Sequence, residues 1–292
     1  MPTNIRHAVR AGTFYESSPA SCEHHAQKLL AGAEIPSDFP LTVYGGIVPH
    51  AGWMYSGGLS ALTLASINNV SPLKRVVLFG ADHVGTVRLG EVFDSGIWRT
   101  PLGEVGIDDE IASAILKSSS LLRANPRAHS QEHSLEVQVP LLQTLNPDVK
   151  IIPIGVPPSS QAVEIGQAVG KILAEKFPDA RVIGSTDLTH HGGHFGSPGG
   201  RGEAGRHWSE QNDRRMIDLI LAMQDEKIVE EAMEHENACG AGAIAATISA
   251  CKAMGADRGI LLDYTNSYRV IHSILPGEPD DTTVGYASIV FA

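Results

Sequence analysis

The sequence carries five side chains whose types and positions suit metal binding or proton transfer. His50 lies in VPHAG, His83 in GADH, Asp187 and His190 in STDLTHH, and Cys239 in NACG. Two imidazoles combined with one thiolate or carboxylate form a three-ligand site that leaves coordination positions open for substrate, water or dioxygen. The sequence therefore predicts an open transition-metal site that includes His50.

Asp187 and His190 are spaced for a proton-transfer role beside such a site. At positions i and i+3 they can lie on one side of a turn, where the carboxylate fixes the imidazole tautomer and raises its basicity. His190 is then the general acid or base. The alternative is that His190, His191 and His194 are surface residues of a mobile loop, since residues 186–205 are rich in glycine and polar side chains.

Cys239 has two interpretations. It precedes a small-residue helix predicted over residues 239–251, and a helix start lowers the pKa of a thiol, which suits a metal ligand or a nucleophile. Free cysteine is also a common small core residue. Cys22 and Cys251 lie in helical patterns without polar company and are predicted to be structural. The three cysteines form no CxxC pair, which argues against a disulfide framework or a zinc knuckle.

The predicted elements explain how residues far apart in sequence can meet. Continuous apolar runs predict buried strands at residues 43–48, 75–80, 150–156 and 181–185. His50, His83 and Asp187 each follow one of these strands. Ligand sites in α/β sheets lie beyond the carboxyl ends of the strands. We therefore expect the candidate residues to gather at one edge of the sheet, although His50 taken alone is better explained as a hydrogen-bonded turn residue.

Helical patterns separate and follow these strands. We predict helices over residues 20–30, 58–67, 108–117, 128–142, 161–176, 206–223, 227–235 and 239–251, with further strands at 259–264 and 284–291. Glu132, His133 and Glu136 form a polar cluster in the fourth helix that can support the site. With no repeat and no linker, residues 1–292 are predicted to form a single α/β domain, its central sheet mostly parallel or mixed and flanked by helices.

Composition limits the classes of partner. The formal net charge of −11 and the lack of a dense basic run argue against a nucleic-acid partner. No apolar stretch approaches the roughly 20 residues of a membrane span, and the first ten residues lack the apolar core of a signal peptide. We expect a cytoplasmic protein with a small-molecule or peptide ligand. Thirteen histidines, several of them clustered, favour a metal site.

The motifs VPHAGWMYSG, GADH, EHSLEVQVPLL, STDLTHHG and NACG, with AGTFYES near the start, together resemble the Memo family, the AmmeMemoRadiSam system protein B group. The resemblance spans nearly the whole chain. It implies a fold related to the class III extradiol (LigB-type) dioxygenases and one mononuclear metal site. It also implies AMMECR1-like and radical SAM proteins of the same system as partners.

The resemblance also implies roles for individual residues. His50 and His83 match the two family histidines at the metal, and Cys239 matches the cysteine that stands where the dioxygenases use a glutamate. Asp187 and His190 match the pair that lines the same pocket, with His190 as the acid or base. A thiolate ligand favours copper, zinc or thiolate-bound Fe(II). The expected cofactor is one transition-metal ion, foremost Fe(II) or copper, with zinc also compatible.

Three functions remain open on the sequence. The first is a metal-dependent oxidoreductase with dioxygenase-like chemistry on a small molecule. The second is a copper-binding or peptide-binding protein that uses the same pocket without turnover. The third, a hydrolase with Cys239 as nucleophile and His190 as base, ranks lowest because it gives His50 and His83 no role.

Overall fold

Parallel strands form the centre of the sheet. The computed structural model describes residues 4–85, 87–193, 195–196, 199–275 and 282–292. The central strands are β8 (Lys150–Gly155), β3 (Arg75–Gly80), β9 (Arg181–Ser185) and β2 (Gly45–Val48), which lie side by side in this order and run parallel. The predicted central strands are therefore confirmed.

Antiparallel pairs on both sides make the sheet mixed. Next to β2 lies β12 (Thr283–Phe291), which pairs antiparallel with β2, β11 (Gly259–Asn266) and β10 (His190–His191). On the other side of β8 lie β6 (Gly103–Ile107), β5 (Ile97–Thr100) and β1 (Ile5–His7), while β4 (Gly90–Val92) pairs with β8 and β7 (Leu122–Ala124). The prediction of an α/β fold with a mixed central sheet is confirmed.

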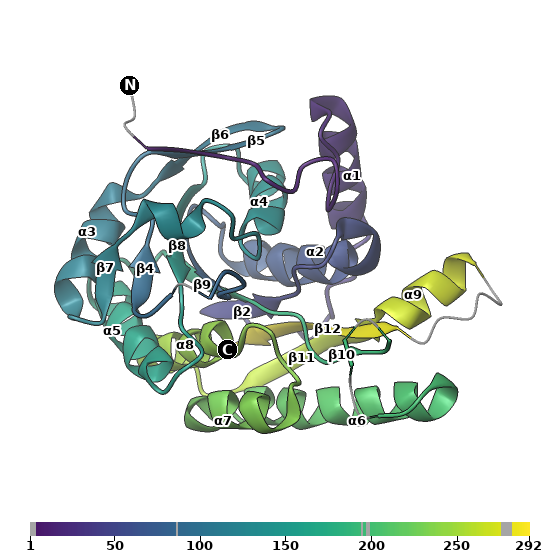
Figure 1. The fold of residues 1–292 in the computed structure, drawn as a ribbon. Coiled ribbons are helices and arrows are strands. Elements are labelled where there is room, and N and C mark those ends of the chain that lie inside the picture. Colours follow the sequence, from purple (N-terminus) through teal and green to yellow (C-terminus); the bar gives the residue numbers. More distant parts are fainter. Residues whose placement is uncertain (1–3, 86, 194, 197–198, 276–281) are drawn as a thin grey trace.

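Helices cover both faces of this sheet (Figure 1). Because side chains alternate along a strand, Val76 and Leu78 of β3 face one core, and Val77 and Phe79 face the other. The first core is closed by α1 (Pro19–Ala31), α2 (Trp53–Val70) and α4 (Val139–Leu145). The second is closed by α3 (Asp109–Ser118), α5 (Gln161–Lys176), α6 (Gly202–Leu221), α7 (Asp225–His235) and α8 (Ala241–Met254).

The helix predicted over residues 128–142 is wrong for most of its length. The chain forms short 3-10 turns at Pro126–His129 and Glu136–Gln138, and α4 begins only at Val139. Arg6 explains the difference, since its guanidinium donates to the carbonyl oxygens of His129 and Glu132, at 2.9 and 2.6 Å. A helix would use these carbonyls for its own i to i+4 bonds. A residue more than a hundred positions away therefore keeps this segment irregular.

Other differences concern element ends and weak patterns. Helix α2 begins at Trp53 rather than 58, and α6 at Gly202 rather than 206. Helix α9 (Ser267–Ile274) was not predicted, although its apolar residues lie on one face; it is only eight residues long and buries none of them fully. Among the described residues, none of the helices is both long and apolar enough to cross a membrane.

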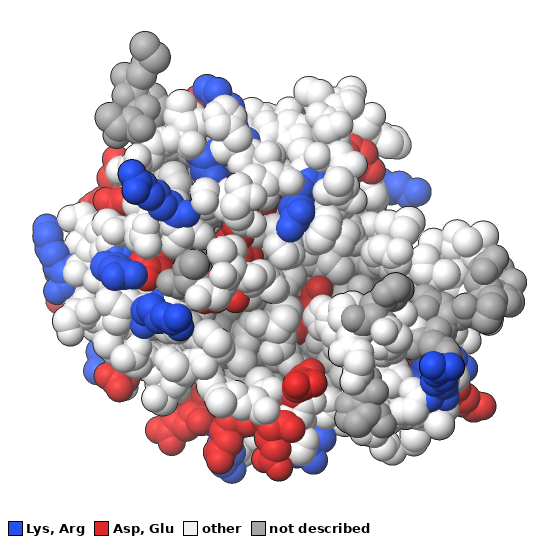
Figure 2. All heavy atoms as spheres, viewed as in Figure 1, with Lys and Arg blue, Asp and Glu red and all other residues white. Residues whose placement is uncertain are grey.

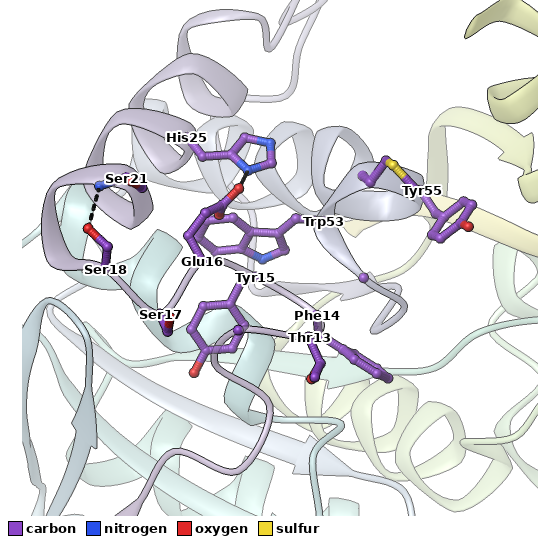
Figure 3. Close-up of a pocket in the computed structure, with 13 residues that line it drawn as sticks. Thr13, Phe14, Tyr15, Glu16, Ser17, Ser18, Ser21, His25, Trp53 and Tyr55 are labelled. Atoms are coloured by element: carbon purple, nitrogen blue, oxygen red, sulfur yellow. Dashed lines mark hydrogen bonds and ion pairs between the residues drawn. The ribbon is translucent and has the colours of Figure 1, made fainter. Parts of the chain in front are cut away.

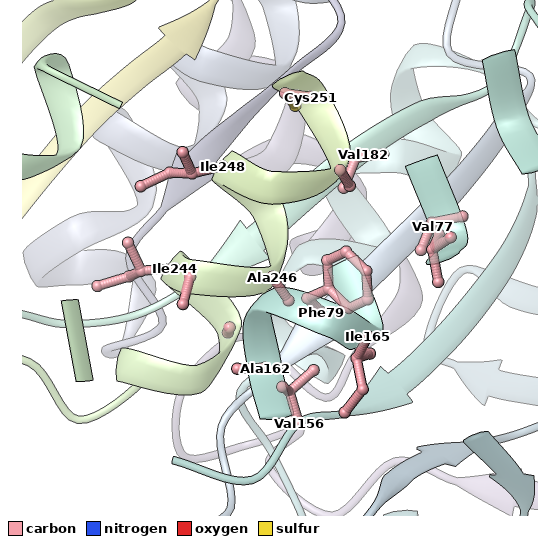
Figure 4. Packing of buried hydrophobic residues seen from close by; sticks show 14 of the residues in the cluster. Val77, Phe79, Val156, Ala162, Ile165, Val182, Ile244, Ala246, Ile248 and Cys251 are labelled. Carbon is pink, nitrogen blue, oxygen red and sulfur yellow. The ribbon is translucent and has the colours of Figure 1, made fainter. Parts of the chain in front are cut away.

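Helices α5 and α8 pack unusually close together because both present small residues. A Cβ added at Gly166 or Gly170 of α5 would collide with the backbone of Ala246 or Ala250 in α8. Figure 4 shows Ala246 of α8 beside Ala162 and Ile165 of α5, with Phe79 of the sheet next to them. The small residues of both helices therefore allow their backbones to approach closely.

This contact predicts opposite results for two glycine-to-alanine substitutions. Gly166→Ala is expected to lower the free energy of unfolding by about 1–3 kcal/mol, since the extra methyl forces two backbones apart. Gly58→Ala, on an exposed part of α2 with open space around the added Cβ, is expected to raise it by about 0.5–1 kcal/mol. Urea unfolding of both variants checks this; equal effects would contradict the close helix contact.

Candidate metal centre

Three of the predicted residues come together at the carboxyl edge of the parallel strands. His50 follows β2, His83 follows β3, and Cys239 lies in the turn before α8. Each offers a nitrogen or sulfur ligand atom, and these atoms all lie within 4.8 Å of one another. Of these atoms, His50 Nε2 and Cys239 Sγ lie 3.2 Å apart. The spacing fits a single ion held between two imidazoles and one sulfur.

His50 is buried, and its tautomer follows from its neighbours. The Ser185 hydroxyl donates to the carbonyl oxygen of Ser134 at 2.7 Å, so its oxygen accepts from His50 Nδ1 at 3.0 Å. The lone pair of His50 is therefore on Nε2, beside Cys239. Burial, followed by repulsion from His83, keeps the pKa of His50 well below its usual value, so the ring is neutral, as a metal ligand must be.

Glu132 fixes the tautomer of His83, as Ser185 does that of His50. Its carboxylate accepts from His83 Nδ1 at 3.0 Å and from the His83 backbone N–H at 2.9 Å. The second ring nitrogen, Nε2, is thus left for the metal position, in the arrangement that commonly supports a metal-bound histidine. Burial opposes charge on His83, but hydrogen bonds to Cys239 and Glu132 outweigh it and raise the pKa of His83 to about 10. A bound cation takes the place of the proton on Nε2.

The thiol of Cys239 differs from the sequence expectation. Burial raises its pKa, so the lowered value expected at a helix start is wrong for the metal-free protein. Helix α8 begins two residues later, at Ala241. The backbone N–H of Asp187 points at the sulfur, at 3.3 Å, and can stabilise a thiolate. Loss of the thiol proton is then coupled to arrival of a cation.

Asp187 and His190 both line the cavity in front of this centre, but they are not paired as the sequence suggested. Asp187 Oδ1 accepts the backbone N–H of His50 at 2.7 Å. His190 Nδ1 lies 2.9 Å from the carbonyl oxygen of Leu188, which can only accept. Leu188 therefore fixes the tautomer of His190, in place of the predicted Asp187 carboxylate. Nε2 of His190 is left without a proton and can act as a base.

The cavity itself holds about 490 Å³. It is lined by Thr13, Phe14, His50, Ala51, Gly52, Tyr55, His83, His133, Asp187, His190, Phe195, Ser267, Ile271, Thr282, Val284 and Tyr286. The candidate metal centre, with two imidazoles and a sulfur, therefore opens onto a space of small-molecule size with aromatic and aliphatic walls.

His133 has a larger place in the site than the sequence suggested. Its ring stacks on that of His83, with centroids 4.6 Å apart, and it lines the cavity. Burial, followed by repulsion from His83, lowers the pKa of His133 to about 4, so it is neutral at neutral pH. The EHSLE motif was the signal for this residue. Ser185 had no such signal, since its role depends on a contact with His50 across 135 positions.

A second group of possible ligands consists of His83, Glu132 and His133. It suits a metal less well, because the Glu132 oxygens already accept the backbone N–H groups of His83, His133 and Ser134, at 2.7 to 2.9 Å. Of the other histidines in the glycine-rich loop, the one that the structure describes, His191, does not join the centre. His191 packs against Trp208, and His194 lies outside the described residues.

A neighbouring cavity of about 500 Å³ shares Thr13, Phe14, Gly52 and Tyr55 with the first. Figure 3 shows it between the N-terminal segment and the starts of α1 and α2. Its wall includes the pair His25 and Glu16, 2.7 Å apart. A ligand longer than the first cavity therefore has space beside it.

Behind the His190 segment, Asp213 is a fully buried carboxylate, and burial raises its pKa to about 7. Between about pH 4 and 7 the folded protein keeps a proton that the unfolded chain releases, so this group makes stability fall as pH rises. Asp213→Asn lacks this dependence. The difference in the free energy of unfolding, Asp213→Asn minus wild type, is expected to rise by up to about 4 kcal/mol as the pH increases from 4 to about 7, and then to level off.

Urea midpoints at pH 4, 5.5 and 7 measure this difference, because other titrating groups contribute equally to both proteins. The exposed Asp263→Asn serves as the control and is expected to show a constant difference. A constant difference for Asp213→Asn as well would contradict the raised pKa.

Comparisons with known proteins identify the family of this chain. A family model described as Memo-like protein matches residues 6–290. A MEMO1 family protein of Methanopyrus kandleri is 34% identical over 295 residues, covering 96% of each chain. Proteins of the same description from Pyrococcus abyssi, at 34%, and Nitrosopumilus maritimus, at 33%, each cover 98% of this chain and 99% of their own length. The chain therefore belongs to the Memo-like protein family.

Proposed function

We propose that this protein binds one transition-metal ion through His50, His83 and Cys239 and uses it for dioxygenase-like redox chemistry on a small molecule. The observation that carries the proposal is the convergence of the three ligand atoms within 4.8 Å at the base of an open cavity. When bound, the ion supplies Lewis acidity and a route for electrons between substrate and dioxygen.

The residues around the ion have separate tasks. Ser185 and Glu132 hold the Nδ1 protons of the two ligand histidines, so that both rings present Nε2 to the ion. His190, with Nε2 unprotonated, accepts a proton from a substrate group in the cavity. Asp187 holds the His50 backbone and narrows the base of the cavity. Phe14, Phe195 and other apolar side chains exclude water from the remaining walls.

The donor set limits the metal. Two neutral imidazoles and a thiolate form a softer site than a set with a carboxylate, which favours copper, zinc or thiolate-bound Fe(II) over Mg²⁺ or Ca²⁺. For redox chemistry we propose Fe(II) or copper, because zinc has no accessible second oxidation state.

The second candidate is a copper-binding or peptide-binding protein without turnover. The neighbouring cavity favours it, because two adjoining cavities that share Phe14 and Tyr55 in their walls suit an extended ligand. The hydrolase alternative is weaker, since the imidazole beside the Cys239 sulfur is that of buried His50 rather than His190.

Partners and compartment belong to the same proposal. We propose AMMECR1-like and radical SAM proteins as partners and a cytoplasmic location, as the family resemblance of the sequence implies. The net charge of −11 opposes a nucleic-acid partner, and Figure 2 shows acidic side chains gathered over α7, with Lys and Arg scattered on the same face. Co-purification with each partner from a cytoplasmic fraction tests this part.

Metal analysis under anaerobic conditions tests the main proposal. Wild-type protein purified without added metal is expected to hold close to one equivalent of iron or copper, and His50→Ala much less. The loaded protein is then expected to consume dioxygen with small aromatic or thiol substrates. No metal in either preparation would overturn the metal function, whereas a metal-loaded protein that consumes no dioxygen would favour the second candidate.

A further inference from the structure

The segment that carries His190 is held from behind by a buried carboxylate on α6. Asp213 is fully buried, and its Oδ1 accepts the backbone N–H of Thr189, the residue before His190, at 2.7 Å. Its Oδ2 accepts the hydroxyl of Tyr264, from β11, at 2.6 Å. Asp213 thus joins three parts of the chain at one point behind the cavity.

Every polar group of Thr189 is used in this arrangement. Its N–H goes to Asp213, its hydroxyl oxygen accepts from the side chain of Asn212 at 3.2 Å, and its carbonyl oxygen accepts from Gly285 at 3.1 Å. The N–H of Leu188 in turn donates to the carbonyl oxygen of Gly285 at 2.8 Å. These bonds fix the backbone on both sides of the carbonyl that holds the His190 ring.

The space around Asp213 allows little movement. A Cβ added at Gly285 would overlap the Asp213 carboxylate, so β12 approaches it directly. Among the described ion pairs, none includes Asp213, and the charge of another acid, Glu210, raises its pKa further. Burying an acid without a neighbouring cation lowers the stability of the fold. We therefore attribute the hydrogen bonds of Asp213 to a role in holding the neighbouring segment.

We propose that Asp213 is a positioning residue: it holds Thr189 in place, so that Leu188 keeps the proton on His190 Nδ1 and His190 presents an unprotonated Nε2 to the cavity. The inference rests on the proposed role of His190 and adds the element that sets its tautomer. Asp213 does not touch the cavity and acts only through this segment.

Nitrogen-15 NMR of the histidine rings in the full-length, metal-free protein at neutral pH tests the proposal. In wild type, His190 is expected to be protonated on Nδ1. In Asp213→Ala, the Nε2-protonated form, which free imidazole prefers, is expected to gain roughly three- to tenfold relative to wild type, as when one hydrogen bond is lost. Asp213→Asn keeps an acceptor for Thr189 and is expected to restore the wild-type pattern.

Tyr264→Phe is the matched control, because it removes the other hydrogen bond of Asp213 and leaves Thr189 held. The Tyr264→Phe protein is expected to be less stable than wild type but to keep the wild-type His190 tautomer. A purely structural role of Asp213 could not explain a tautomer change that occurs in Asp213→Ala and not in Tyr264→Phe. An Nε2-protonated His190 in wild type, or an unchanged tautomer in Asp213→Ala, would overturn the proposal. If Asp213→Ala does not fold, Asp213→Ser is measured against the same two outcomes.

The measurement needs neither metal nor substrate, so its result is separate from that of the proposed function. Loss of metal binding with a normal His190 tautomer would reject the metal function alone. The reverse result would reject only the role of Asp213.

Discussion

Cys239→Ser is expected to lower the affinity for copper, zinc or Fe(II) by roughly a hundredfold to a thousandfold. Zinc sites with four ligands bind with about 10–16 kcal/mol, or on average about 3 kcal/mol per ligand, and a serine hydroxyl is a poor replacement for a thiolate. The substitution nearly preserves the volume, so the fold is expected to remain. Competition with a chelator of known affinity measures the change.

Cys22→Ala provides the control for this experiment. Cys22 is also a free, buried thiol, but it lies on α1, away from the centre. Its loss is expected to leave metal affinity within a factor of about two. Cys239→Ser protein that binds metal as tightly as wild type would remove Cys239 from the ligand set and leave a site of histidines and a carboxylate.

The second large effect is expected at Glu136. This buried carboxylate forms an ion pair with Arg6 at 2.7 Å and accepts the backbone N–H groups of Val9 and Arg10 and the hydroxyl of Tyr15. Glu136→Gln places an amide where these donors converge and leaves the Arg6 charge uncompensated. It is expected to lower the free energy of unfolding by about 3–5 kcal/mol. Urea denaturation measures the loss.

An exposed ion pair of the same length serves as the control. Arg99 and Glu104 also lie 2.7 Å apart, but both side chains are about half exposed, so Glu104→Gln is expected to change stability by less than about 1 kcal/mol. Hydrogen exchange adds a local test, since residues 9–15 are expected to lose protection in Glu136→Gln. Equal stability of the two variants would show that the N-terminal segment is held by other contacts.

Glu136 also connects stability with the site. The segment that it holds ends at Phe14 and Tyr15, and Phe14 lies edge-on to His133, with ring centroids 5.1 Å apart, in the wall of the cavity. Glu132 and Glu136, four residues apart, therefore have different tasks. Glu132 orients the candidate metal ligand His83, and Glu136 fixes the wall in front of it. The sequence indicated only that both belong near the site.

Much of the fold was available from the sequence. The apolar runs at residues 75–80, 150–156 and 181–185 predict buried parallel strands, because only strands covered on both faces are apolar at every position. Once the strands are parallel, His50, His83 and Asp187 must emerge at the same edge. Helix α9 was missed because its eight residues are fewer than the window over which a helical period can be recognised, although its apolar residues share one face.

The sequence by itself thus determined which side chains gather, because strand direction and strand ends follow from local pattern. Only the tertiary structure decided what each side chain does there. The nitrogen that each histidine offers is set by Ser185, Glu132 and Leu188, the first two of them distant in sequence from the ring they hold. Burial raises the pKa of Cys239, whereas the nearby helix start alone would lower it. Hydrogen-bond partners and burial depend on packing between distant segments, and no local pattern encodes them.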